Sequence, residues 1–117
     1  MTTYFVNIRE IPLLLIKNGE KTIELRVNKG IFREIKKGDK LWFSHHTDLL
    51  NNIEKEVIRV EKYKSFRECL ETNIDILHEI NPLSNSIEES LDIYLKPNGI
   101  YTKDKESKYG VVAFFIN

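Results

Sequence analysis

Polar and apolar residues alternate strictly from Thr22 to Val27. Thr22, Glu24 and Arg26 occupy every second position, and isoleucine, leucine and valine lie between them. This period of two predicts a β-strand with one buried and one polar face. Glu24 and Arg26 therefore share the polar face, roughly 6–7 Å apart. Lys21 has the opposite parity to Glu24, and it joins that face only if it lies in the turn after Gly19.

Four further segments have the β-branched and aromatic composition of strands. They span residues 4–8, 40–45, 54–63 and 109–116, with a polar loop expected over residues 46–52. The last segment is almost entirely apolar, which predicts an interior strand buried on both faces.

Helices are predicted where the strand patterns stop. Pro12 is placed at the start of a short apolar helix that Gly19 ends. Ser65 and Ser86 each begin a Ser-x-x-Glu capping box. We expect one helix to follow Ser65, with a possible extension to Ile80, and a second to follow Ser86 and end at the turn 97–99.

These elements predict one α+β domain over residues 1–117. It has about five strands, a short helix before the second strand and a helical insert before the last strand. Such a strand set can curl into a small β-barrel, which leaves no exposed sheet edge, although an open sheet fits the same pattern.

Composition narrows the class of protein. The 18 basic and 18 acidic residues cancel, which excludes a uniformly basic coat for nucleic acid but not a local basic patch. The single cysteine, Cys69, cannot form an internal disulfide, as expected in a reducing compartment. The apolar runs are shorter than the ~20 residues that span a bilayer, and no signal-type stretch begins the chain. We expect a soluble, cytoplasmic protein without membrane contact.

The charges are sorted along the chain. Basic residues outnumber acidic ones between Lys17 and Lys40, whereas acidic residues dominate the insert from Phe66 to Leu95. Sorting of this kind is typical either of solvated faces or of a dipolar molecule whose basic side meets an anion. The acidic insert is a candidate surface for a protein partner.

Two motifs resemble the ASCH domain family. Residues 19–26 read Gly-Glu-Lys-Thr-Ile-Glu-Leu-Arg, and Gly38-Asp39 precedes the aromatic-ended strand Lys40 to Phe43. The similarity continues in order through the rest of the chain. The resemblance implies a PUA-like β-barrel, an association with RNA, and a ligand cleft beside the barrel that is lined from the second strand.

The cleft that this resemblance implies contains a small set of polar and aromatic side chains. Its candidate ligand-binding residues are Lys21, Thr22, Glu24, Arg26, Lys40, Trp42, Tyr63 and Lys108. The Arg26 guanidinium is a planar fork that suits phosphate or carbonyl oxygens, and Glu24 can accept from an exocyclic amine. Either Trp42 or Phe43 can stack on a base, because neighbouring strand residues point to opposite faces. The alternative is a solvated strand face whose charges pair across strands.

Six lysines are candidates for a phosphate-attracting rim around the cleft. They are Lys17, Lys29, Lys36, Lys37, Lys40 and Lys108. The expected partner is therefore RNA or a nucleoside-like ligand.

The enzymatic alternative is a small nucleoside amidohydrolase or a ribonuclease that uses Lys21 and Glu24. Some proteins resembling this family remove an acetyl group from acetylated cytidine with a lysine and a threonine three residues later. Lys21 matches that lysine, but Glu24 occupies the threonine position, so the hydroxyl nucleophile is missing. Glu24 also raises the pKa of a neighbouring lysine and so opposes a role as base. We rank binding first.

No metal or cofactor is expected. His45, His46 and Asp48 are close in sequence, but adjacent histidines on a strand point apart. No third ligand completes a set of the count that zinc requires.

Overall fold

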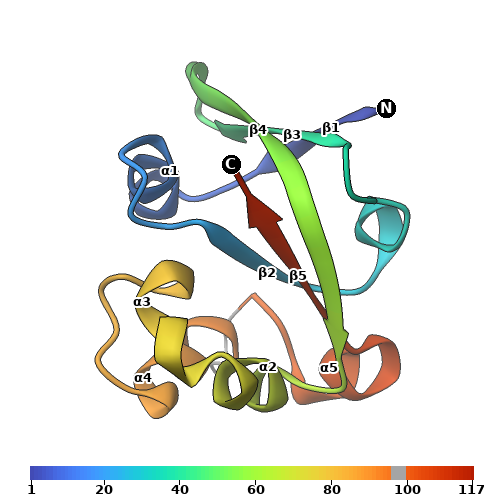
Figure 1. Cartoon of the computed structure of the whole chain (residues 1–117), viewed down its shortest axis with the longest axis vertical. Helices are drawn as coiled ribbons and strands as arrows, with labels where there is room; N and C mark the ends of the chain where they lie inside the picture. The colour runs from blue at the N-terminus through green and yellow to red at the C-terminus, as the bar shows by residue number, and fades with distance from the viewer. Residues whose placement is uncertain (96–99) are drawn as a thin grey trace.

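The computed structural model describes residues 1–95 and 100–117 as a five-stranded sheet with helices on its flanks (Figure 1). The strands are β1 (Thr3–Asn7), β2 (Ile23–Val27), β3 (Lys40–His45), β4 (Asp48–Tyr63) and β5 (Val111–Ile116). The helices are α1 (Glu10–Lys17), α2 (Phe66–Thr72), α3 (Leu77–Ile80), α4 (Ile87–Tyr94) and α5 (Lys103–Tyr109), with the 3-10 helices η1 (Gly30–Arg33) and η2 (Ile74–Ile76). The predicted turn at 97–99 lies outside the described residues.

The strand order is β1-β3-β4-β5-β2, with β1 parallel to β3 and every other neighbouring pair antiparallel. The predicted α+β fold class is confirmed, and β5 is an interior strand as its unbroken apolar pattern predicted. Within residues 1–95 and 100–117 no ladder joins β1 to β2. The sheet is therefore open along the line where a barrel would close.

The two edge strands nevertheless approach each other through a side chain. Nη2 of Arg26, on β2, donates a hydrogen bond of 3.0 Å to the carbonyl oxygen of Asn7, on β1. Because β1 and β2 are at opposite ends of the strand order, this contact requires the sheet to curl until its edges face each other. We call this line of approach the seam.

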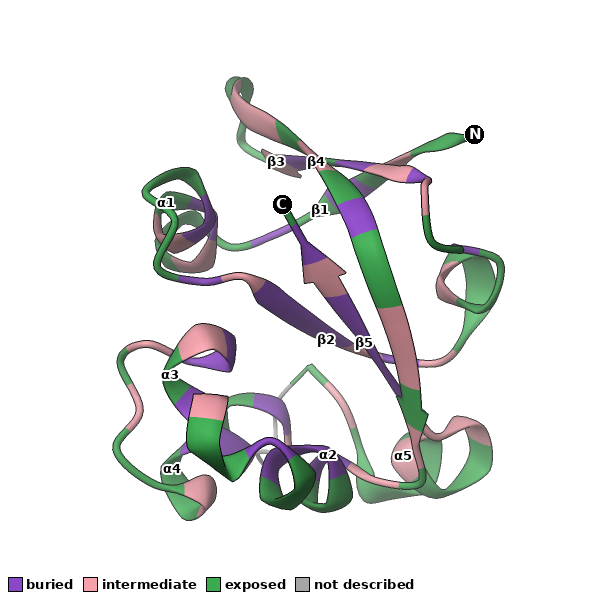
Figure 2. Ribbon diagram, viewed as in Figure 1, coloured by how far each residue is buried: buried purple, intermediate pink, exposed green. Residues whose placement is uncertain are grey.

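Two hydrophobic clusters occupy the two faces of β2 and β5. On β5, Val112 and Phe114 point into the curled sheet, whereas Val111 and Ala113 point toward α2, α3 and α4. The latter helices cover one side of β2 and β5 (Figure 1), and the buried residues follow these strands and the inner turns of the helices (Figure 2). Each fully buried large apolar side chain contributes about 1.5–3 kcal/mol. The apolar residues of β2 belong to the helix-facing cluster, so Glu24 and Arg26 point the other way.

The serine half of each predicted capping box is confirmed. The Ser65 hydroxyl accepts from the backbone N–H of Glu68 at 3.0 Å, and the Ser86 hydroxyl accepts from that of Glu89 at 3.2 Å. Each bond satisfies one of the unpaired N–H groups that begin a helix. Helices α2 and α4 therefore begin where the sequence pattern placed them.

Two parts of the fold differ from the sequence prediction. The expected loop over residues 46–52 is a tight hairpin, because β4 already begins at Asp48, which pairs with His45. Helix α5 was not predicted: its residues are almost all polar, so no apolar period marks it. Its start is fixed instead by the Thr102 hydroxyl, which accepts from the backbone N–H of Lys105. None of the helices in the described ranges is long and apolar enough to cross a membrane.

Gly110 has to be a glycine for two reasons. Its φ of 73° and ψ of −170° belong to a region that only glycine populates readily. A Cβ at this position would also lie 2.9 Å from the Tyr63 carbonyl oxygen, a backbone atom that cannot move aside. We expect Gly110→Ala to lower the free energy of unfolding by about 1–3 kcal/mol or more, measured by urea denaturation followed by far-UV circular dichroism.

Gly19→Ala is the matched control. Gly19 also has a positive φ, of 85°, but a Cβ there meets no atom within 4 Å. Gly19→Ala should therefore lower the free energy of unfolding by less than Gly110→Ala does. Equal destabilisation by the two substitutions would show that the Tyr63 clash contributes nothing.

Candidate functional site

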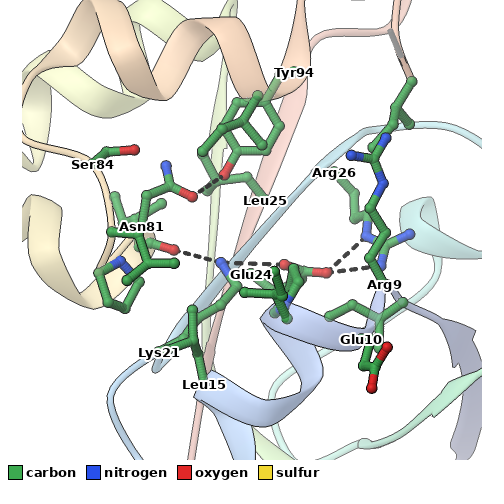
Figure 3. A pocket seen from close by; sticks show the side chains of 18 of the residues that line it. Arg9, Glu10, Leu15, Lys21, Glu24, Leu25, Arg26, Asn81, Ser84 and Tyr94 are labelled. Atoms are coloured by element: carbon green, nitrogen blue, oxygen red, sulfur yellow. Dashed lines mark hydrogen bonds and ion pairs between the residues drawn. The ribbon is translucent and has the colours of Figure 1, made fainter.

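A pocket of about 610 Å³ opens between the β1–α1 junction, the start of β2, the α3–α4 connection and the end of α4. Its apolar wall consists of Ile8, Ile11, Pro12, Leu15, Leu25, Ile80, Pro82, Leu83, Ile93, Tyr94, Ile100 and Tyr101. Its polar residues are Asn7, Arg9, Glu10, Lys21, Glu24, Arg26, His46, Asn81 and Ser84. In Figure 3, Lys21, Glu24 and Arg26 follow one another, with Asn81 and Ser84 to one side and Arg9 to the other.

Lys21 is buried, with 5% of its surface exposed. Its Nζ donates to the carbonyl oxygens of Ile23, at 3.0 Å, and of Ile80, and it lies 3.4 Å from Oε1 of Glu24. Ile80 is the last residue of α3, so Lys21 satisfies a carbonyl at the end of a helix, where a positive charge is favoured. The ammonium group thus has three acceptors for its three N–H bonds.

Lys21 reaches this position because it precedes the strand. Strand β2 begins at Ile23, and the backbone N–H of Lys21 donates to the carbonyl of Leu15 at the end of α1. Lys21 therefore lies in the turn after Gly19. Only from this turn can it meet Glu24, because its position in a regular strand would point it to the opposite face.

Glu24 and Arg26 form the second half of the network. Oε2 of Glu24 accepts from both Nε, at 3.0 Å, and Nη2, at 2.8 Å, of Arg26. The Arg26 guanidinium also lies 5.1 Å from the centre of the Phe32 ring. The bond that Nη2 donates across the seam to Asn7 holds the guanidinium from a second side. The residues Lys21, Glu24 and Arg26 together are called the ionic triad below.

Burial and the neighbouring charges shift the pKa values of the ionic triad in opposite directions. Burial lowers the pKa of Lys21, and Glu24 opposes that shift. For Glu24, burial alone raises the pKa, but the charges of Arg26 and Lys21 and their hydrogen bonds outweigh it, so the pKa lies below its ordinary value. The pKa of Arg26 is raised: burial opposes the charged form, but Glu24, together with Tyr101, more than compensates. Two cations thus share one anion, which leaves one net positive charge beside an apolar wall.

Asn81 and Tyr94 are a second polar pair in the pocket wall. The Tyr94 hydroxyl donates to Oδ1 of Asn81 at 3.0 Å, and the Tyr94 ring stacks on Phe66 with 4.4 Å between ring centres. Burial raises the pKa of Tyr94, so its hydroxyl keeps its proton. Within the described part of the chain, Nδ2 of Asn81 is buried without a hydrogen-bond partner. Buried amides are usually satisfied, so this donor is a candidate for contact with a ligand after a small side-chain rotation.

Not all predicted site residues meet at this pocket. Lys21, Glu24 and Arg26 line it, and Thr22, Lys40, Trp42, Tyr63 and Lys108 do not. Thr22 instead donates its hydroxyl to Glu79 at 3.0 Å. Trp42 points outward and contacts Phe5 with ring centres 5.0 Å apart, whereas Phe43 is in the core. Lys40 pairs with Glu54, Tyr63 accepts from Asn73, and Lys108 lies over Tyr109.

The six candidate rim lysines do not surround the pocket either. None of them is among its lining residues, although Lys36 and Lys37 line a second, more open hollow. Conversely, Arg9, His46, Asn81 and Tyr94 line the pocket without having been predicted. The Asn81-Pro82 pair signals a helix end in the sequence, but no sequence pattern indicates that the Asn81 side chain faces a cavity.

No cluster of metal-ligating side chains is found among the described residues. Over residues 1–95 and 100–117, no three histidine, cysteine, aspartate or glutamate side chains gather as metal ligands would. His45 stacks on His46 with 4.8 Å between ring centres, and Nδ1 of His45 lies 2.6 Å from the Thr47 hydroxyl.

Comparison with known proteins places the chain in a family. The ASCH domain profile matches residues 6–117, so the chain belongs to the ASCH domain family. No curated protein matches the chain.

The solved structures that are similar to this one include the following three. Hypothetical protein PH0355 is 32% identical with a TM-score of 0.84, and the match covers 100% of this chain and 98% of that one. Protein PF0455 from Pyrococcus furiosus is 35% identical with a TM-score of 0.75, over 98% and 96% of the two chains. An ASCH protein from Zymomonas mobilis shares the fold at 10% identity and a TM-score of 0.64, over 98% of this chain and 66% of that one.

Removing the anion of the ionic triad should strongly destabilise the fold. Glu24→Gln leaves Lys21 and Arg26 as buried cations without a counter-charge, and breaking a buried pair in this way costs about 3–5 kcal/mol. The control is Glu61→Gln, because the Glu61 side chain is 43% exposed and pairs with Arg59 at 3.1 Å. An exposed pair contributes less than about 1 kcal/mol. Urea denaturation at neutral pH measures both changes, and similar destabilisation by the two substitutions would refute the buried network.

The effect of Glu24→Gln should also depend on pH. A carboxyl whose pKa is lowered by folding contributes stability above its unfolded pKa and loses it as the pH falls through the folded pKa. We expect the stability difference between wild type and Glu24→Gln to be constant at neutral pH and to shrink below the ordinary glutamate value of 4.5. Urea midpoints measured over that acid range test this. A difference that stays constant would mean that folding does not lower the pKa of Glu24.

Proposed function

We propose that this ASCH domain protein binds RNA or a nucleobase-containing ligand in the pocket beside the ionic triad. The observation that carries the proposal is the burial of Lys21, Glu24 and Arg26 side by side in the wall of a mostly apolar pocket. A solvated strand face would leave these charges in water, but the side chains of Lys21 and Glu24 are only 5% and 8% exposed.

The size and lining of the pocket suit a flat, partly apolar ligand. Its volume of about 610 Å³ is within the range of about 300–1,000 Å³ typical of small-molecule sites. Such sites combine apolar walls with a few placed polar groups that set orientation. Leu15, Ile80 and Tyr94 offer apolar contact, and the triad supplies the polar groups. A nucleobase has this character, because its faces are apolar and its edge is polar.

The hydrogen-bonding groups of the triad match the edge of a base. Among the described residues, Oε1 of Glu24 has only the 3.4 Å contact with Lys21, so it remains able to accept from an exocyclic amine. Both hydrogen bonds from Arg26 to Glu24 go to Oε2, and the net positive charge favours a carbonyl or phosphate oxygen nearby. Hydrogen bonds to a charged group are the stronger kind.

The enzymatic alternative has weaker support. A lysine that acts as a base needs a free lone pair, but Nζ of Lys21 is surrounded by Ile23, Ile80 and Glu24 oxygens. The neighbouring hydroxyl, that of Thr22, is bonded to Glu79 and does not line the pocket. Burial does lower the pKa of Lys21, which is the observation that favours catalysis.

Arg26→Lys tests the binding role, because it keeps the charge of the triad but removes the planar fork. We expect wild type to bind at least one ribonucleoside, ribonucleotide or short single-stranded RNA, as measured by isothermal titration calorimetry. The variant should bind that ligand about tenfold more weakly, a loss of ~1.4 kcal/mol. Incubation of the same ligands followed by mass spectrometry detects any turnover.

The control is Arg59→Lys. Arg59 also pairs with a glutamate two residues away, Glu61, and also lies over a phenylalanine ring, that of Phe115, but its side chain is 56% exposed. This variant should bind as wild type does. The proposal fails if no ligand of these classes binds wild type or if both variants lose affinity equally. Turnover that Lys21→Ala abolishes would establish the enzymatic alternative instead.

A further inference from the structure

A second hollow lies apart from the pocket and is lined by basic residues. Its volume is about 900 Å³, and Tyr4, Arg33, Lys36, Lys37, Val60 and Lys62 line it together with Glu34 and Ile35. These residues come from β1, the end of η1 and the segment that follows it, and β4. We call this hollow the basic groove. It shares no lining residue with the pocket.

The positive charges of the groove are only partly neutralised by the protein. Within residues 1–95 and 100–117, no ion pair joins Arg33, Lys36, Lys37 or Lys62 to a carboxylate. Glu34 supplies one opposing charge in the lining. The nearby Asp39 carboxylate is held in its turn by the backbone N–H groups of Thr2 and Lys36. Because the whole chain has a formal net charge of +0, this excess is local.

We infer that the basic groove binds the phosphate backbone of a single-stranded RNA. The inference rests on the proposed function in its choice of RNA, but it assigns the phosphates to residues outside the pocket. The four cations form a sequence-independent contact, since phosphate contacts position a strand without reading its bases. Tyr4 adds an aromatic ring to the lining, which can stack on a base or pack against a sugar.

The groove and the pocket are connected through two elements. Strand β1 carries Tyr4, in the groove, and Asn7, at the pocket. Two residues of strand lie between them, and the three residue steps span about 10 Å. On the other side, Phe32 of η1 contacts the Arg26 guanidinium, and its neighbour Arg33 lines the groove. An RNA strand that follows these two elements would place a base in the pocket and its phosphates in the groove.

The test replaces two exposed lysines of the groove in the full chain, as Lys36→Gln with Lys37→Gln. The probe is a fluorescein-labelled oligouridylate of about twelve nucleotides, a length within the ~4–16 that one small domain covers. Fluorescence anisotropy gives its affinity at several salt concentrations. We expect the double variant to bind several-fold more weakly. The slope of log affinity against log salt should become less steep by about 1.4, or ~0.7 for each phosphate of a single strand that a lysine no longer neutralises.

The control variant makes the same change of charge elsewhere. Lys103 and Lys105 are exposed on α5 and line neither the pocket nor the groove. Lys103→Gln with Lys105→Gln should leave the affinity and the salt slope close to those of wild type. Equal effects in the two double variants would contradict the inference about the groove, because they would show that the net charge of the protein alone attracts the RNA. An unchanged slope in the groove variant would overturn it as well.

The outcome separates this inference from the proposed function. If the groove variant binds free nucleosides as wild type does but loses affinity for the oligouridylate, the pocket and the groove are both supported. If wild type binds the oligouridylate through the groove but no nucleoside, the groove is supported and the pocket proposal fails. If nucleosides bind to wild type and the groove variant binds the oligouridylate like wild type, the inference about the basic groove is wrong, whereas the pocket proposal stands.

Discussion

The structure depends on one carboxylate that is shared by two buried cations. Through Lys21, Glu24 is linked to the end of α3, and through Arg26 it is linked to β1 across the seam. The triad thus joins the α1–β2 turn, a helix of the insert and both edges of the sheet. The cost of removing these charges from water is large, and it is offset only while all the partners are in place. The position of the helical insert relative to the sheet is therefore tied to the same contacts that form the pocket.

This arrangement also prepares the pocket for a ligand. Because the side chains of the triad are held by carbonyls and by each other, little side-chain freedom remains to be lost when a ligand binds. Groups of the wall that keep bonding capacity include Oε1 of Glu24 and Nδ2 of Asn81, whose Oδ1 accepts from the Tyr94 hydroxyl. The basic groove is different, since Lys36 and Lys37 are exposed to solvent. The two regions thus differ in character: the triad is buried and held by its partners, whereas the lysines of the groove are exposed.

Strict alternation from Thr22 to Val27 allowed β2 and the shared face of Glu24 and Arg26 to be predicted from sequence, because a half-buried strand imposes that period. The parity of Lys21 set a condition that the structure meets: it could join Glu24 only from a turn after Gly19. Helix α5 was not, since a polar helix on the surface has no apolar period. The choice between Trp42 and Phe43 was open for a related reason: alternation assigns two faces but does not say which one is the core. The roles of Asn81 and Tyr94 depend on how the insert packs on the sheet, and no local pattern encodes that.

The location of Trp42 has a consequence for spectroscopy. It is the single tryptophan of the chain, and it lies on the outer face of β3 against Phe5, outside the lining of the pocket. Its emission reports the environment of the β1–β3 edge. The chromophores in the pocket wall are the phenols of Tyr94 and Tyr101. Optical titrations directed at the pocket should therefore follow tyrosine absorbance, because the indole lies outside the pocket lining.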